Sequence, residues 1–156
     1  QLDLYNPKWP IYNYHFSLPP AKFVHNEEVD VHGLPRIGKA INSIVCDGCI
    51  VSGSTVTSSI LFNSVFVHSY ATVHNSILLN DVDIGEHCRT RNCIIDKHNV
   101  IPRGTIIGYD REEDAKRYPV VDLGPEYGPD AWLTVIPKDR HYQMLELPKS
   151  LETHQL

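Results

Sequence analysis

The chain has 156 residues, 42% of them hydrophobic, which is enough for one domain with a buried core. Its net charge of −5 argues against nucleic acid or an anionic membrane as the main partner, and no apolar run approaches the roughly 20 residues of a membrane-spanning helix. Residues 1–34 are rich in proline, so we expect an extended linker that docks on the rest of the domain. The opening QLDLYNPKWP lacks a signal-peptide pattern, and we expect a cytoplasmic protein.

A sequence repeat dominates residues 35–108. The segments NSIV, SSIL, NSIL and NCII begin at positions 42, 58, 75 and 92, so the period is 16 or 17 residues. Within a period, aliphatic residues recur every six positions, as at Ile94, Val100 and Ile106. A period of about three hexapeptides is typical of a triangular parallel β-helix, in which each coil buries its inward residues against its neighbours. The sequence therefore predicts an all-β solenoid over residues 35–108.

Strand alternation assigns a side to each aliphatic residue of the repeat. We place the first aliphatic residue of each repeat inside the solenoid: Ile44, Ile60, Ile77 and Ile94. The next residue then points outward, which predicts an outer aliphatic stripe formed by Val45, Leu61, Leu78 and Ile95. A contiguous apolar stripe usually marks an interface, so we interpret these residues as a partner surface, with a tolerated surface column as the alternative.

The corner that follows the stripe carries mostly turn-forming residues. The aligned positions hold Asp47, Asn63, Asn80 and Lys97. Asp and Asn tolerate unusual backbone angles and bond to nearby backbone, whereas a lysine adds a cation. A carboxylate inside the coil stack would be too costly, so we expect the chain to turn at Asp96 while Lys97 projects outward.

The charge around Lys97 is positive, although the whole chain is acidic. Residues 86–103 contain two anions and four cations, the cations being Arg89, Arg91, Lys97 and Arg103. A cation cluster on a rigid solenoid can hold a phosphorylated ligand through charge-assisted hydrogen bonds. The alternative is that Lys97 pairs with Asp96 or simply points into solvent.

The four cysteines raise the question of a metal or redox site. Cys46 and Cys49 form a CxxC stretch, but Cys88 and Cys93 have four residues between them, and a single CxxC is a weak signal. Cys88 also falls where the repeat requires a small inward residue. We therefore expect free cysteines that pack as small apolar residues in a reducing cytosol, and no metal site.

Residues 109–140 are expected to complete the same domain with a helix and a returning strand. The stretch DREEDAKRY predicts a short helix, with Asp110 as its N-cap, Glu113 completing a capping box and Pro119 after its end. A turn-rich connection follows, and AWLTVIP then predicts one more strand. We expect residues 141–156 to be a disordered tail.

Several segments together resemble the C-terminal domain of the ADP-glucose pyrophosphorylase (glucose-1-phosphate adenylyltransferase) family: LDLYNPKWPI, SLPPAKFV, the repeats, IIDKHNVIPRG, EEDAKR and LTVIPK. They cover most of residues 1–140. The resemblance implies a left-handed parallel β-helix that packs on the protein's own N-terminal catalytic domain. It also implies a share in building a homotetramer and in binding an anionic small-molecule effector.

The resemblance further implies that the catalytic residues lie elsewhere in a longer protein. The family makes ADP-glucose and pyrophosphate from ATP and glucose 1-phosphate in glycogen or starch synthesis, with a glycine-rich GGxGxRL loop that cradles phosphates. The present sequence contains neither that loop nor a P-loop. We therefore expect no cofactor in this chain, and we expect Mg²⁺ to serve the catalytic domain.

The family's basic effector residues can be matched one by one. Its IID-K/R element supplies one such residue, matched here by Lys97. A second follows the late VTVI strand, where Pro137 intervenes, so Lys138 and Arg140 compete for the role. Arg89 and Arg91 complete the set of candidates.

Two other classes of hexapeptide β-helix remain as alternatives. Acyltransferases of this kind use a histidine base, for which the candidates are His68, His74, His87 and His98, but their usual long projecting loop is missing. Gamma-type carbonic anhydrases bind zinc through three histidines. The histidines here do not recur at the coil period, since Gly85 and Arg91 stand 17 residues after His68 and His74. We interpret the histidines as surface or cap residues.

Overall fold

Three β-sheets wind around one axis in the computed structural model, which describes residues 17–29, 33 and 35–138. Sheet 1 contains β1 (Lys22–Val29), β2 (Pro35–Ile37), β5 (Ile50–Ser52), β8 (Phe66–Val67), β11 (Asp83–Ile84) and β14 (Val100–Ile101). Sheet 2 contains β3 (Lys39–Ile41), β6 (Thr55–Thr57), β9 (Thr72–His74), β12 (Arg89–Arg91) and β15 (Ile106–Ile107). Sheet 3 contains β4 (Ile44–Val45), β7 (Ile60–Leu61), β10 (Ile77–Leu78), β13 (Cys93–Ile95), β16 (Val120–Asp122) and β17 (Trp132–Ile136).

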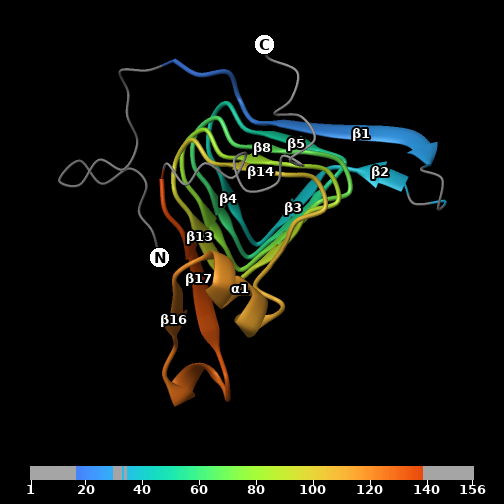
Figure 1. Cartoon of the computed structure of the whole chain (residues 1–156). Coiled ribbons are helices and arrows are strands. Elements are labelled where there is room, and N and C mark those ends of the chain that lie inside the picture. Colours follow the sequence, from blue (N-terminus) through green and yellow to red (C-terminus); the bar gives the residue numbers. More distant parts are fainter. Residues whose placement is uncertain (1–16, 30–32, 34, 139–156) are drawn as a thin grey trace, which may run out of the picture.

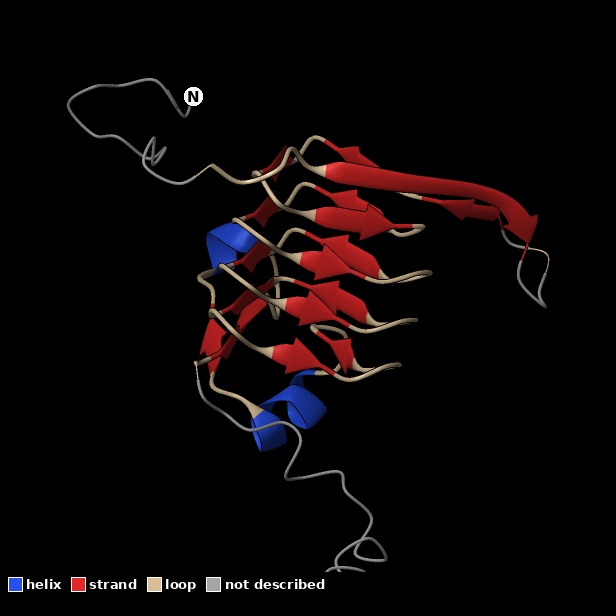
Figure 2. Ribbon diagram, turned by 90° about the horizontal axis from the view of Figure 1, so that it is seen from above, coloured by secondary structure: helices blue, strands red, loops and turns tan. Residues whose placement is uncertain are grey.

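The coils stack in parallel register, which confirms the predicted left-handed parallel β-helix. Seen along the axis, the chain traces a triangle (Figure 1), and the side view shows the stacked coils (Figure 2). Equivalent residues of successive repeats are direct neighbours: Ile77 pairs with Ile60 on one side and Ile94 on the other. β1 adds to sheet 1 beside β5, so part of the segment expected to be a docking linker continues a solenoid sheet.

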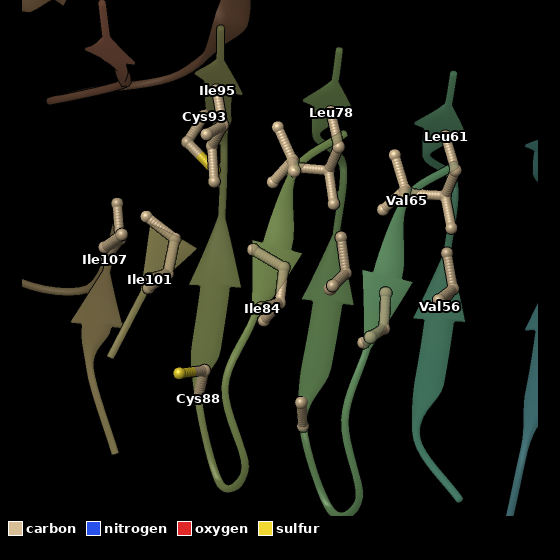
Figure 3. Close-up of a cluster of buried hydrophobic side chains, with 14 of the residues drawn as sticks. Val56, Leu61, Val65, Leu78, Ile84, Cys88, Cys93, Ile95, Ile101 and Ile107 are labelled. Carbon is tan, nitrogen blue, oxygen red and sulfur yellow. The ribbon is translucent and has the colours of Figure 1, made fainter. Parts of the chain in front are cut away.

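The predicted inward and outward sides of the repeat are wrong, because they are exchanged in the structure. Leu61, Leu78 and Ile95 are 0% exposed and belong to the core (Figure 3), and Val45 packs against it. The residues predicted to face inward are only half-buried: Ile44, Ile60, Ile77 and Ile94. The predicted interface stripe is therefore the core itself.

The physical reason lies in the small residue before each aliphatic doublet. Ser59, Ser76 and Cys93 are buried two positions before the inward Leu61, Leu78 and Ile95, on the same side of the strand. Because both residues of a doublet such as Ile77–Leu78 are aliphatic, periodicity alone cannot tell which one is buried. The small residue does distinguish them, since only a small side chain fits inside the tight corner. Cys88 occupies such a position and is buried, as predicted.

Each corner of the triangle contains one residue with a left-handed backbone. After sheet 2 these are Asn42, Ser58, Asn75 and Asn92, with φ between 46° and 50°. After sheet 3 they are Gly48, Ser64, Asp81 and His98, one position later than the Asp47–Lys97 ladder that we predicted to hold the unusual backbone angles. The left-handed region favours glycine, asparagine and aspartate, which explains most of these identities.

A helix and a hairpin close the last coil. The helix α1 (Arg111–Arg117) is capped by Asp110, whose side chain accepts hydrogen bonds from the backbone N–H of Glu112 and Glu113 as predicted. Glu113 does not complete a capping box, because its carboxylate accepts from Lys116 instead. The connection that follows α1 contains β16, which pairs antiparallel with β17, and the short 3-10 helix η1 (Pro125–Tyr127).

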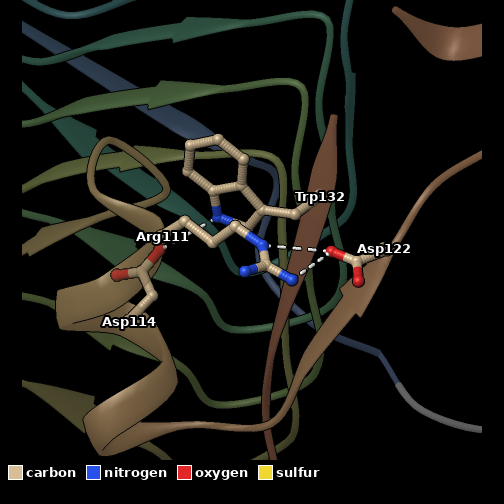
Figure 4. Close-up of polar contacts among 4 residues, drawn as sticks. All are labelled: Arg111, Asp114, Asp122 and Trp132. Carbon is tan, nitrogen blue, oxygen red and sulfur yellow. Dashed lines mark hydrogen bonds and ion pairs between the residues drawn. The ribbon is translucent and has the colours of Figure 1, made fainter. Parts of the chain in front are cut away.

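The side chain of Asp114 ties this closing unit to the solenoid. It is 3% exposed, and one carboxylate oxygen accepts from the Gly108 N–H at 2.7 Å, from Thr134 Oγ1 at 2.9 Å and from Trp132 Nε1 at 3.3 Å (Figure 4). A buried carboxylate is tolerated only when donors satisfy it, and here the donors come from the last coil and from β17. The predicted returning strand is thus held in place by a helix residue.

Candidate functional site

The corner after β13 brings two lysines together. The Asp96 Oδ1 atom accepts a hydrogen bond from the Lys97 backbone N–H at 2.7 Å, so the chain turns at Asp96 as predicted. The Oδ2 atom of the same carboxylate lies 3.3 Å from the backbone N of Lys138, which donates to it. Two lysines far apart in the sequence are therefore joined through one carboxylate.

Strand pairing and a buried amide hold this corner. β17 runs parallel to β13, and the Asp96 N–H donates to the Ile136 carbonyl at 2.9 Å. Asn99 is 4% exposed, and its Nδ2 atom donates to the carbonyls of Asp96 (2.8 Å) and Pro137 (3.2 Å). These bonds fix the backbone on both sides of the two lysines. We call Asp96, Asn99, Lys97 and Lys138 the lysine corner.

Both lysines of this corner are available to a ligand. Their side chains are exposed, and neither ammonium group lies within 4.0 Å of a carboxylate in the part of the chain that the structure describes. The alternative pairing of Lys97 with Asp96 is not formed, because the Asp96 carboxylate bonds to backbone N–H groups. Arg140, the competitor of Lys138, lies outside the described residues.

The structure separates the other cations of the predicted cluster from this corner. Arg89 and Arg91 lie on β12 in sheet 2, where both guanidinium groups stack against the ring of Tyr109. Arg103 lies at the corner between sheets 1 and 2, with its guanidinium 3.7 Å from the Glu86 carboxylate. The positive stretch at residues 86–103 is therefore spread over three parts of the triangle.

The outer face of sheet 3 carries an apolar column that contains the four isoleucines predicted to face inward. Its members are half-buried and lie in register from coil to coil: Ile44, Ile60, Ile77, Ile94 and Val135. We call these five residues the outer column. Phe62 and Leu79, which directly follow the inward Leu61 and Leu78, are half-buried beside the outer column. The small residues before the inward positions were the signal that could have identified this face.

Among the described residues, the histidines and cysteines do not assemble into a reactive site. His68 contacts Asp83 at 3.0 Å and His98 contacts Asp81 at 3.4 Å, and no group of three His, Cys, Asp or Glu residues could hold a metal ion within residues 17–29, 33 and 35–138. All four cysteines are free. Burial raises the pKa of Cys49 to about 11 and that of Cys93 to about 12, so neither is a thiolate near neutral pH. None of the described helices is long and apolar enough to span a membrane.

Comparison with known proteins finds a hexapeptide-repeat family and several similar enzymes of one name. The family model described as "GlmU-like, C-terminal hexapeptide" matches residues 19–125. A glucose-1-phosphate adenylyltransferase of Dechloromonas aromatica is 48% identical over 124 residues, which are 80% of this chain and 27% of that protein. The enzyme of the same name from Alteromonas mediterranea is 51% identical over 117 residues (75% and 26%), and that of Shewanella oneidensis is 43% identical over 152 residues (97% and 32%). The chain thus spans about a third or less of these relatives.

Proposed function

The chain belongs to the GlmU-like, C-terminal hexapeptide family, and from its similarity to adenylyltransferases we propose that it is the regulatory and assembly part of a glucose-1-phosphate adenylyltransferase. Its share of the relatives' length, together with the missing phosphate-cradling loop, supports a chain whose catalytic residues and Mg²⁺ belong to the remainder of the parent protein. The observation that carries the regulatory role is the lysine corner.

The lysine corner supplies what an anionic effector needs. Lys97 and Lys138 are exposed, are free of carboxylate partners among the described residues, and have their backbones fixed by Asp96 and Asn99. Two ammonium groups carried by fixed backbone bind a phosphate or carboxylate more tightly than lysines of a mobile loop, because less backbone ordering opposes binding. We therefore assign these two lysines to an anionic small-molecule effector.

β17 gives the effector a route to the rest of the molecule. Lys138 follows the end of β17 by two residues, and Lys97 follows the end of β13 of the solenoid by two residues. A ligand held by both lysines would strengthen the contact between the closing hairpin and the solenoid. If that contact has two arrangements, an effector that binds one of them more tightly shifts the equilibrium between them by the difference in its binding free energies.

The outer column is the surface that we assign to assembly. Five aliphatic residues in register across sheet 3 form a continuous apolar strip, and such strips on a folded domain usually mark an interface. We propose that the outer column contacts the remainder of the parent polypeptide or a neighbouring subunit of a homo-oligomer. This replaces the predicted stripe, of which Leu61, Leu78 and Ile95 are buried in the core and Val45 packs against it.

The experiment compares lysine variants in the full-length enzyme. Lys97→Ala and Lys138→Ala should each raise the activator concentration for half-maximal effect about tenfold, since ~1.4 kcal/mol of lost binding is one decade. Activity without activator should stay near that of the wild type, because catalysis resides elsewhere. Arg103→Ala, which removes an exposed cation from another corner, is the matched control.

Two results would count against this assignment. Unchanged activator response in the Lys97→Ala, Lys138→Ala double variant would leave the lysine corner without a regulatory role. Release of pyrophosphate from ATP and glucose 1-phosphate by the present 156-residue chain alone would show that it carries its own catalytic site.

A further inference from the structure

Two arginines of sheet 2 are arranged around one aromatic ring. The guanidinium carbon of Arg89 lies 4.5 Å from the centroid of the Tyr109 ring, and that of Arg91 lies 4.6 Å from the same centroid. The Nε–H of Arg91 also donates to the Gly108 carbonyl at 3.1 Å. Stacking on the ring and this hydrogen bond restrict where the two charged groups can lie.

No anion within the described chain neutralises this pair. Neither guanidinium forms an ion pair with any described carboxylate, in contrast to Arg103 and Arg111, which do. The strands of sheet 2 contain three cations and no carboxylate, although the chain carries a net charge of −5. The strands of sheet 2 therefore carry an excess of positive charge, which favours an anionic ligand.

The donors that remain are suited to a phosphorylated group. With its Nε–H engaged, Arg91 still has both terminal NH₂ groups, and the exposed Arg89 has all of its donors. Because each guanidinium carbon lies within 4.6 Å of one centroid, the two carbons are at most twice that distance apart. Charge-assisted hydrogen bonds of about 2.8 Å on either side of a diphosphate can span such a separation.

We propose that Arg89, Arg91 and Tyr109 form a diphosphate-binding site on the outer face of sheet 2, separate from the lysine corner. The arginines donate to the phosphate oxygens, and Tyr109 orients them without touching the ligand. The ligand class is a small molecule that carries a diphosphate group. This site does not depend on the proposed function, because it is defined by residues of another sheet and can be tested on the present chain.

The test uses inorganic pyrophosphate as the probe and follows the NMR signals of the arginine Nε–H groups in the 156-residue chain. The Arg89 and Arg91 signals should shift to saturation, whereas Arg103 should shift weakly and without saturation. Tyr109→Leu keeps every charge, yet it should weaken pyrophosphate binding about fivefold or more, because the guanidinium groups lose their support. The Lys97→Gln, Lys138→Gln double variant should keep the wild-type shifts of the Arg89 and Arg91 signals, even though it removes the cations of the lysine corner.

A second charge-preserving variant covers the case in which Tyr109→Leu fails to fold. Arg89→Lys with Arg91→Lys retains both cations but removes the planar forks, and it should weaken binding to a similar extent, followed in this variant through the backbone N–H signals of β12. Linear shifts equal to those of Arg103 would overturn the site, as would loss of the shifts in the lysine double variant. Saturation by malonate at a lower concentration than pyrophosphate would overturn the diphosphate assignment and point to carboxylates of a partner surface.

Discussion

The coils of the solenoid and the closing strand β17 belong to the same stack, but β17 has polar contacts that the inner coils lack. Each inner coil buries equivalent aliphatic residues against equivalent neighbours, as Leu61, Leu78 and Ile95 do in sheet 3. β17 continues this stacking, with Ile136 buried next to Ile95, but it is also held by polar side chains that occur once in the chain, Asp114 and Asn99. The inner coils therefore depend on many similar contacts, whereas the closing strand adds a few specific ones, which suits a regulatory contact better than a coil would.

The largest expected effect comes from placing a charge inside the coil stack. Leu78→Asp should lower the free energy of unfolding by roughly 4 kcal/mol or more, because the carboxylate would be buried without a partner. Ile77→Asp, at the adjacent position on the outer column, should cost less than about 1 kcal/mol in the isolated chain. Urea unfolding of the two variants measures the difference. Equal losses would contradict the assignment of inner and outer sides.

A smaller effect is expected when the closing strand is detached. Asp114→Ala should cost about 3 kcal/mol, because it leaves the Gly108 N–H and Thr134 Oγ1 donors without their acceptor. Amide hydrogen exchange should then show faster opening of β17, with β7 and β10 still protected. Asp122→Ala, which removes only the exposed ion pair with Arg111 (Figure 4), should cost under about 1 kcal/mol. Uniform loss of protection through all coils would show that β17 is not a separate unit.

The smallest expected effect comes from a buried thiol, Cys93, in the core next to β17. Burial raises the pKa of the Cys93 thiol from 9.0 to about 12, so the unfolded chain loses this proton at lower pH than the folded chain. The contribution of the neutral Cys93 thiol to the free energy of unfolding is therefore fully present below pH 9. This contribution is lost as the pH rises from 9 towards 12, by about 1.4 kcal/mol per pH unit. Unfolding free energies of the wild type and Cys93→Ala, measured from pH 8 to pH 11, should differ by a pH-dependent amount. Parallel pH profiles would contradict a buried neutral thiol.

The sequence predicted the residues of the candidate site better than it predicted which of those residues lie together. Lys97 at a turn made by Asp96 follows from local turn chemistry, whereas Lys138 was expected from the family resemblance, with Arg140 as its competitor. Arg89 and Arg91 were grouped with Lys97 because they are near it in the sequence. The structure separates them, because a six-residue step along a triangular coil carries the chain to a different face.

The sequence by itself determined the solenoid, its period and its closing helix, because these depend on local chemistry that repeats along the chain: aliphatic residues every six positions, turn-forming residues between them and an Asp110 cap. The tertiary structure showed which residue of each aliphatic doublet is buried: Ile77 and Leu78 are both strongly hydrophobic, and in the sequence only the small residue two positions before Leu78 distinguishes them. It also decided that Asp96 joins Lys97 to Lys138 and that Asp114 joins α1 to β17. Those contacts link segments far apart in the chain, and their geometry exists only once the coils have stacked.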